Sequence, residues 1–148
     1  MKNNREFNFA DLERRRKMVE ICSTFGLILV AVGMLVPFAA IDNSSLIMAM
    51  KVVYAIGAVV YTVARMINVN SPTDSTKLKR MRRMEMWGGF CFILGGFFWF
   101  YNSARYPLIP FSVAVMRDTV AFTMAGAIIQ VVASWMITAR MKKEMSNK

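Results

Sequence analysis

Polar residues that could do chemistry in an apolar environment are concentrated near the C-terminus. They recur at intervals close to the 3.6-residue helical repeat, and so share one face of a helix: Thr119, Thr123, Gln130, Ser134 and Thr138. Unpaired amides and hydroxyls are costly in hydrocarbon, so this face must contact protein or water. Two interpretations stay open: a hydrogen-bonding seam that lines a substrate or ion path, or interhelical contacts that hold the fold together.

Charged residues at the edges of the apolar stretches could also contribute to a substrate or ion path. Lys51 and Asp118 are expected toward one end of the protein, where they could approach each other if the helices form a bundle. An ionisable residue within a membrane is by default a functional hypothesis, although a long side chain near the interface can reach the headgroups. The candidate residues of a polar path are therefore Thr123, Gln130, Ser134, Lys51 and Asp118.

Two glutamates flank the apolar stretches at their other end. Glu20 and Glu85 each follow a cation by three residues, Lys17 and Arg82 respectively. At that spacing a local ion pair on the helix surface is expected. No acidic residue lies at the centre of an apolar stretch. This argues against a proton-coupled carrier built on a buried carboxylate, such as the small four-span multidrug exporters.

Several classes of chemistry lack their residues. The chain has no His, so His-ligated metals, His-based triads and imidazole acid–base catalysis are excluded. The two cysteines, Cys22 and Cys91, are far apart and form no Cys-x-x-Cys motif. No phosphate-binding, nucleophile-elbow or dinucleotide motif occurs. We therefore expect no catalytic residues, no metal, no cofactor and no enzyme activity.

The elements that must position the polar residues are membrane-spanning helices. The 148 residues are 56% hydrophobic, and charges are rare over long stretches. About 20 apolar residues cross a hydrocarbon core. We predict an all-α polytopic membrane protein, a single domain over 1–148 in which four spans form two antiparallel hairpins: about 19–41, 45–64, 84–102 and 113–139. The second span is the least clean, because Lys51 interrupts it.

The distribution of Lys and Arg predicts the orientation. Of the 19 such residues, 16 fall in three segments, 1–18, 65–83 and 140–148, and only Lys51, Arg105 and Arg117 fall elsewhere. By the positive-inside rule these three segments are cytoplasmic. Both termini are therefore expected inside, in a membrane that we predict to be the cytoplasmic (inner) membrane of a bacterium.

Glycines spaced seven residues apart predict where helices approach closely. Seven residues return almost to the same helix face, and small residues there let two backbones meet. The candidate packing positions are Gly26, Gly33, Gly88, Gly89, Gly95 and Gly96. We expect the glycines of span one to pack on those of span three within one chain, with a dimer interface as the alternative.

Basic segments beside the spans are candidates for contact with anionic lipid headgroups. Each cation near such a surface contributes about 1 kcal/mol. The residues concerned are Arg14, Arg15, Arg16, Lys17, Arg80, Arg82 and Arg83. The simpler alternative is that they only enforce the topology. A net charge of +10 is explained in this way, and no nucleic-acid partner is expected.

The function expected from these features is that of a small, non-enzymatic membrane protein. It would act as an accessory, assembly or scaffold subunit through helix and lipid contacts, as a homo-oligomer or in a larger membrane complex. The alternative is a small oligomeric transporter or channel whose polar path runs along the fourth span.

Overall fold

The computed structural model describes the backbone of residues 2–69, 74–108 and 112–146, and the side chains of these residues except 2–10 and 144. The described residues form four α-helices: α1 (Lys2–Ala39), α2 (Ser44–Val69), α3 (Thr76–Arg105) and α4 (Val113–Ser146). The all-α class expected from the sequence is confirmed. Helix α1 begins well before the predicted first span, because the segment expected to precede that span continues the same helix.

Short polar side chains start three of the helices. Asn43 Oδ1 accepts a hydrogen bond from the Leu46 amide (3.1 Å), and Ser75 Oγ accepts one from the Leu78 amide (3.3 Å). Ser112 Oγ accepts one from the amide three residues later in the same way (3.3 Å). These contacts satisfy amides that have no partner within the first helical turn. The polar residues between the apolar stretches therefore fix where α2, α3 and α4 begin.

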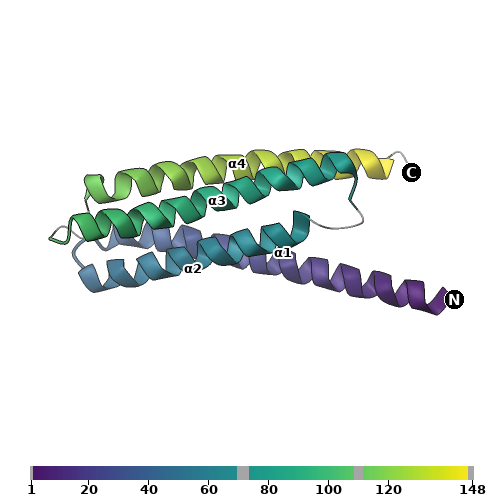
Figure 1. Ribbon diagram of the computed structural model, residues 1–148, viewed down its shortest axis with the longest axis horizontal. Coiled ribbons are helices and arrows are strands. Elements are labelled where there is room, and N and C mark those ends of the chain that lie inside the picture. The colour runs from purple at the N-terminus through teal and green to yellow at the C-terminus, as the bar shows by residue number, and fades with distance from the viewer. Residues whose placement is uncertain (1, 70–73, 109–111, 147–148) are drawn as a thin grey trace.

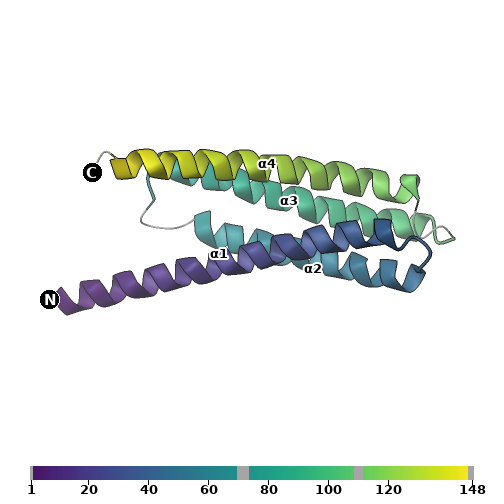
Figure 2. The ribbon, with the colours of Figure 1, turned by 180° about the vertical axis from the view of Figure 1, so that it is seen from behind.

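The helices pack in the order of the chain. Helix α1 packs on α2, α2 on α3, and α3 on α4. Figure 1 shows α3 and α4 side by side along the long axis, and Figure 2 shows α1 crossing α2 on the opposite face. Both chain ends, the end of α2 and the start of α3 lie at one end of the bundle, which we name the terminal end. The first turns of α1 extend beyond the other helices there.

Three of the described helices are long and apolar enough to cross a membrane: Asp11–Ala39, Ser44–Val69 and Val113–Lys143, with mean hydropathies of 2.3, 2.0 and 1.9. Within the described part of the chain, α3 does not reach the same level. Its uncharged stretch contains four glycines, and Trp99, Tyr101 and Asn102 lower its hydropathy further. The prediction of a second span is thus confirmed in spite of Lys51, and α3 is the one predicted span whose composition does not reach this level within the described residues.

Glycines bring α1 and α2 into backbone contact. A Cβ atom added at Gly26 would lie 2.7 Å from the Tyr61 amide nitrogen, and one added at Gly33 would lie 2.7 Å from the Tyr54 amide nitrogen. From the other side, a Cβ at Gly57 would lie 2.8 Å from the Gly26 carbonyl oxygen. The expectation that span one packs on span three was therefore wrong, since these glycines face α2.

The paired glycines of α3 face two different neighbours. Gly88 lies against α4, where a Cβ would meet the Gly126 carbonyl oxygen at 3.2 Å. A Cβ at Gly95 would meet both neighbours, the Tyr54 hydroxyl of α2 at 2.7 Å and the Thr119 carbonyl oxygen of α4 at 3.3 Å. Gly89 and Gly96 lie against α2, next to Thr62 and Tyr54. Adjacent residues on a helix point about 100° apart, so each doublet serves two interfaces. Helix α3 can thus sit close to both α2 and α4.

Aromatic rings fill the centre of the bundle. Tyr54, Tyr61, Phe92 and Trp99 are buried, with Trp99, Tyr54 and Tyr61 fully inaccessible. Tyr54 meets Trp99 edge to face at 5.7 Å between ring centroids, and Tyr61 meets Phe92 at 5.5 Å. Large apolar side chains also cover the outer surface, for example Leu35, Val131 and Trp135. The bundle therefore presents apolar groups both inside and outside, as expected of a protein surrounded by lipid.

Candidate functional site

The polar face of α4 is turned toward α2 and α3. Gln130 is buried, and its Oε1 accepts a hydrogen bond from the hydroxyl of Tyr61 on α2. Gln130 Nε2 donates to Ser134 Oγ (3.2 Å), one turn further along α4. Both ends of the amide are therefore bound inside the bundle. The sequence placed Gln130 and Ser134 on one polar face, and the structure brings them into contact.

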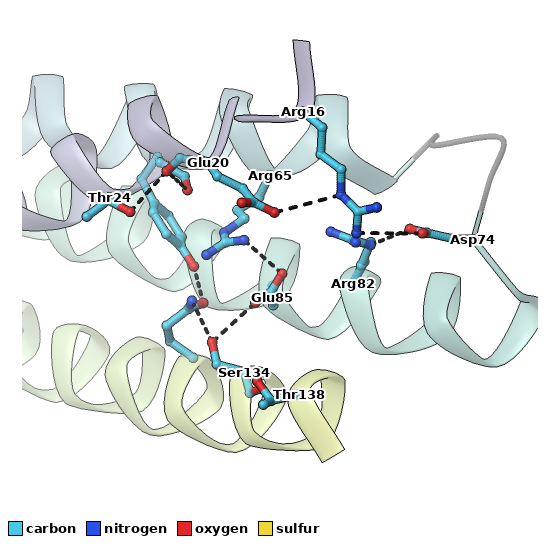
Figure 3. A network of polar contacts seen from close by, with 12 residues as sticks. Arg16, Glu20, Thr24, Arg65, Asp74, Arg82, Glu85, Ser134 and Thr138 are labelled. Carbon is cyan, nitrogen blue, oxygen red and sulfur yellow. Dashed lines mark hydrogen bonds and ion pairs between the residues drawn. The ribbon is translucent and has the colours of Figure 1, made fainter. Parts of the chain in front are cut away.

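From Ser134 the contacts continue to a buried ion pair at the terminal end. Ser134 Oγ donates to Glu85 Oε1 on α3 (3.3 Å), and Arg65 Nη1 on α2 donates to Glu85 Oε2 (3.0 Å). The Glu85 side chain is only 4% exposed and that of Arg65 16%. Figure 3 shows the two side chains pointing toward each other from neighbouring helices. A buried carboxylate of this kind needs a partner charge and further hydrogen bonds, and it has both.

These residues close into a ring. Arg65 follows Tyr61 by one turn of α2, and its guanidinium lies 5.4 Å from the centroid of the Tyr61 ring. The contacts thus lead from Tyr61 on α2 to Gln130 and Ser134 on α4, then to Glu85 on α3. The ion pair between Glu85 and Arg65 returns them to α2. We call this set the polar ring, and its members are Tyr61, Arg65, Glu85, Gln130 and Ser134. It ties three helices together by groups that would be costly to leave unpaired in an apolar interior.

A second ionic cluster joins α1 to the start of α3. Asp74, whose side chain is 3% exposed, contacts Arg82 on α3 (2.5 Å) and Arg16 on α1 (3.8 Å). Arg16 also contacts Glu20, one turn further along α1 (3.8 Å). Figure 3 shows Arg16 and Arg82 converging on Asp74 from two helices. The carboxylate of Asp74 therefore lies between two arginines at the terminal end and offsets one of their two positive charges.

This arrangement corrects three expectations about charge. Glu85 contacts Arg65 across helices, and Glu20 contacts Arg16, so the pairs that the three-residue spacing predicted with Arg82 and Lys17 are not the ones formed. Arg82 is 3% exposed and bound to Asp74, so it is unavailable to lipid headgroups. By contrast, Arg14, Arg15, Lys17, Arg80 and Arg83 lie on the surface.

A pocket of about 250 Å³ opens at the polar ring. All four helices contribute to its wall. The lining side chains are Glu20, Ser23, Thr24, Arg65, Arg82, Glu85, Ser134, Ile137, Thr138 and Met141. The wall thus combines two carboxylates, two guanidiniums and several hydroxyls, which can hold a small polar molecule by ion pairs and hydrogen bonds.

The other candidate path residues lie toward the opposite end and are separate from the polar ring. Thr123 Oγ1 is 2.7 Å from the hydroxyl of Tyr54, which also donates to the Phe92 carbonyl (3.2 Å). Asp118 accepts a hydrogen bond from Asn102 Nδ2 (3.2 Å) and contacts Arg117 (3.2 Å). Lys51 instead lies over the ring of Phe100, 4.8 Å from its centroid. Among the described ion pairs there is none between Lys51 and Asp118.

Sequence reasoning missed four residues of these clusters. Tyr54 and Tyr61 were passed over as ordinary span residues, although they are spaced seven apart and so face the same neighbours. Arg65 counted only toward the orientation, as one cation of segment 65–83, and Asp74 was given no role. Arg65 could have been identified from the sequence, because it follows a tyrosine by one helical turn and so lies on the same helix face.

The described residues contain no group of three or more His, Cys, Asp and Glu side chains that could hold a metal ion. Of the cysteines, Cys22 is exposed and Cys91 is half-buried. No family model, no curated protein and no solved structure matches the chain. The fold itself defines the class: a small, all-α membrane protein built as a four-helix bundle.

Proposed function

We propose that all four helices cross the membrane as two antiparallel hairpins. The composition of helix α3 alone does not predict that it spans the membrane. Its packing against two neighbouring helices supports the crossing. It contacts α2 on one side and α4 on the other, and both of these are apolar enough to span. A helix held by glycine contacts between two spanning neighbours lies at the same depth as they do. The glycines that lower its hydropathy are the residues that allow this position.

We propose further that the terminal end faces the cytoplasm of a bacterial cell. The three basic segments lie at this end, together with the ionic clusters around Asp74 and Glu85. Basic residues concentrated at one end of a spanning bundle favour the cytoplasmic side. The opposite end carries Lys51, Arg105 and Arg117.

Within this frame, the protein acts as a non-enzymatic accessory, assembly or scaffold subunit. One observation carries this proposal: the polar residues of the spanning helices are bound to one another in the polar ring. Their arrangement is that of interhelical contacts that stabilise a fold, each worth about 0.6–2 kcal/mol. The surface left for function is the apolar exterior, which contacts lipid or the helices of another protein.

A small transporter or channel is the alternative, and the pocket at the polar ring favours it. Among the described residues, Arg65 Nε is buried without a hydrogen-bond partner, and Arg65 lines that pocket. Such a donor is available to a bound polar molecule. Purified protein in vesicles should then conduct a small anion such as chloride above the level of empty vesicles. Arg65→Lys, which keeps the charge but removes the Nε donor, should reduce that flux while the protein remains folded.

The orientation can be tested by labelling single cysteines in intact cells. In a chain whose native cysteines are replaced by alanine, Asn43→Cys reports the opposite end and Ser146→Cys the terminal end. A membrane-impermeant maleimide should label Asn43→Cys in intact cells. It should label Ser146→Cys only after the inner membrane is permeabilised. Labelling of Ser146→Cys in intact cells, or protection of Asn43→Cys, contradicts the proposed topology.

The accessory role can be tested by photo-crosslinking in the native membrane. A photoreactive phenylalanine analogue is placed at one exposed position on each helix: Leu35, Ile56, Phe97 and Val131. A subunit of a complex should give a discrete adduct with a second protein from one face and not from all four. Adducts only with lipid at every position contradict the accessory role, and adducts only with itself indicate a homo-oligomer.

A further inference from the structure

A second pocket lies on the outside of the α3–α4 pair, close to the terminal end. Its volume is about 460 Å³, which is within the range of small-molecule sites. The lining comes from the first turns of α3 and the last turns of α4: Thr76, Lys77, Arg80, Met81, Met84, Met136 and Arg140. None of these residues belongs to the polar ring or to the pocket beside it.

The chemistry of this pocket is amphipathic. Three methionines supply the apolar part, and their flexible thioether side chains adapt to a partner of irregular shape. Three cations, Lys77, Arg80 and Arg140, supply the polar part, and no acidic residue is among the described residues that line the pocket. Arginine binds phosphate through two parallel hydrogen bonds, which makes two arginines beside one lysine a strong site for a phosphate diester.

Three arginines of the terminal end are paired with carboxylates of the chain, and the cations of this pocket are not. Arg16, Arg65 and Arg82 are bound to Glu20, Glu85 or Asp74. Among the described contacts, no carboxylate pairs with Lys77, Arg80 or Arg140. No described carboxylate offsets their charge, so an anion seated on the methionines would meet three cations that are free to bind it.

We propose that this pocket binds an anionic phospholipid of the phosphatidylglycerol type. The inference rests on the proposed membrane crossing, in which Lys77 and Arg80 precede the third span and Arg140 follows the fourth. The cations then lie at the depth of the headgroups, and Met84 and Met136 lie at the depth of the first acyl carbons. A headgroup that also carries an ammonium ion fits less well, because the cluster of cations repels it.

The test is lipid retention by the purified full-length protein in an uncharged detergent, measured by native mass spectrometry. Equal amounts of phosphatidylglycerol and phosphatidylcholine are added. The wild type should retain phosphatidylglycerol selectively. Removing two cations with Arg80→Gln and Arg140→Gln should weaken its binding roughly thirty-fold, since each cation contributes about 1 kcal/mol.

The matched control removes the same charge elsewhere. Arg105→Gln combined with Arg117→Gln eliminates two exposed cations toward the opposite end of the bundle, and neither of them lines the pocket. This variant should bind phosphatidylglycerol as the wild type does. If the variant with Arg80→Gln and Arg140→Gln unfolds, Lys77→Gln, at an exposed position on the rim, provides the same test with a loss of roughly five-fold.

Three results would overturn the proposal: equal losses in the two double variants, equal retention of the two lipids by the wild type, or displacement of the lipid by inorganic phosphate. The last would identify a site for a free anion. Binding in detergent does not depend on which end faces the cytoplasm. A failure here therefore leaves the cysteine labelling unaffected, and a reversed labelling pattern leaves the binding result unaffected.

Discussion

The close backbone contact between α1 and α2 makes a sharp prediction about Gly57 of α2. A Cβ atom at this position would lie 2.7 Å from Leu29 Cβ, 2.8 Å from the Gly26 carbonyl oxygen and 2.8 Å from the Val30 amide nitrogen. Ordinary van der Waals contact begins at 3.4 Å, so the shortfall is 0.6–0.7 Å. Two of the three atoms belong to the α1 backbone. In Gly57→Ala the two helices must therefore move apart.

The magnitude follows from comparison with Gly96→Ala on α3. There the nearest atom is Tyr54 Cε1 at 3.3 Å, a shortfall of only 0.1 Å, and it belongs to a side chain. Both substitutions gain about 0.8–1 kcal/mol of helix propensity, so this term cancels between them. When the two helices move apart by about 0.5–1 Å, each affected contact loses about a quarter to a half of its dispersion energy. Inserting a methyl group into a well-packed interface typically costs about 1–3 kcal/mol. Gly57→Ala should therefore be less stable than Gly96→Ala by about 1–3 kcal/mol.

Equilibrium unfolding in mixed micelles measures this difference. The protein is titrated with sodium dodecyl sulfate in a mild detergent, and unfolding is followed by circular dichroism and tryptophan fluorescence. Gly57→Ala should unfold at a lower fraction of dodecyl sulfate than the wild type, and Gly96→Ala at the same fraction or a higher one. Equal midpoints for the two variants would refute the reasoning, because the substitutions differ only in what the new methyl group meets.

The same unfolding assay tests the polar ring. Tyr61→Phe removes the hydroxyl that binds the α4 amide and should lower the free energy of unfolding by about 0.5–2 kcal/mol; Tyr101→Phe, at an exposed ring, should change it little. Glu85→Gln leaves the guanidinium of Arg65 buried without a counter-charge and should cost about 3–5 kcal/mol, with part recovered when Arg65→Gln is added. The exposed charge of Arg117 offers the contrast, since Arg117→Gln should cost about 0–1 kcal/mol. Equal effects for the ring residues and their exposed counterparts would contradict the assigned roles.

The helical class was predictable because lipid leaves so few alternatives. A backbone without water must satisfy its own hydrogen bonds, so long apolar stretches form helices. In the structure, the side chains of Asn43, Ser75 and Ser112 set where α2, α3 and α4 begin, and the prediction of spans from charge-free length did not use them. Charge-free length was a poor guide to which helices are most apolar, because it counts glycine and asparagine as it counts leucine. It ranked α3 above α2, and hydropathy reverses that order.

The partners of the glycines were not predictable from their spacing. A spacing of seven residues identifies a smooth face, but a smooth face accepts any backbone that presents another small residue. The deciding residues were Gly57 on α2 and Gly126 on α4, single glycines that belong to no repeated pattern. The doublets of α3 carried more information. Two adjacent glycines in successive turns open two faces of one helix, which is typical of a helix between two close neighbours.

The ion pairs were missed for a related reason. The rule for residues three or four apart applies to one helix surface, where both partners are exposed and the gain is about 0.2–0.5 kcal/mol. Burial changes the ranking, because a carboxylate that is 4% exposed requires the partner that fits best in three dimensions. Arg65 meets this requirement from the end of α2, and Asp74 then occupies Arg82. A cation whose position is explained by the positive-inside rule can therefore also form an ion pair that stabilises the fold.

The polar ring explains why the polar face of α4 does not by itself define a path. A path needs groups that exchange partners with a passing solute, whereas Gln130 and Ser134 are bound at both ends by neighbours on three helices. Releasing one of them leaves a buried donor or acceptor unpaired, which is costly in an apolar interior. Solute movement along α4 would therefore require the ring to open. A channel formed by this protein would have to pass beside the ring, through the pocket that Arg65 and Glu85 line.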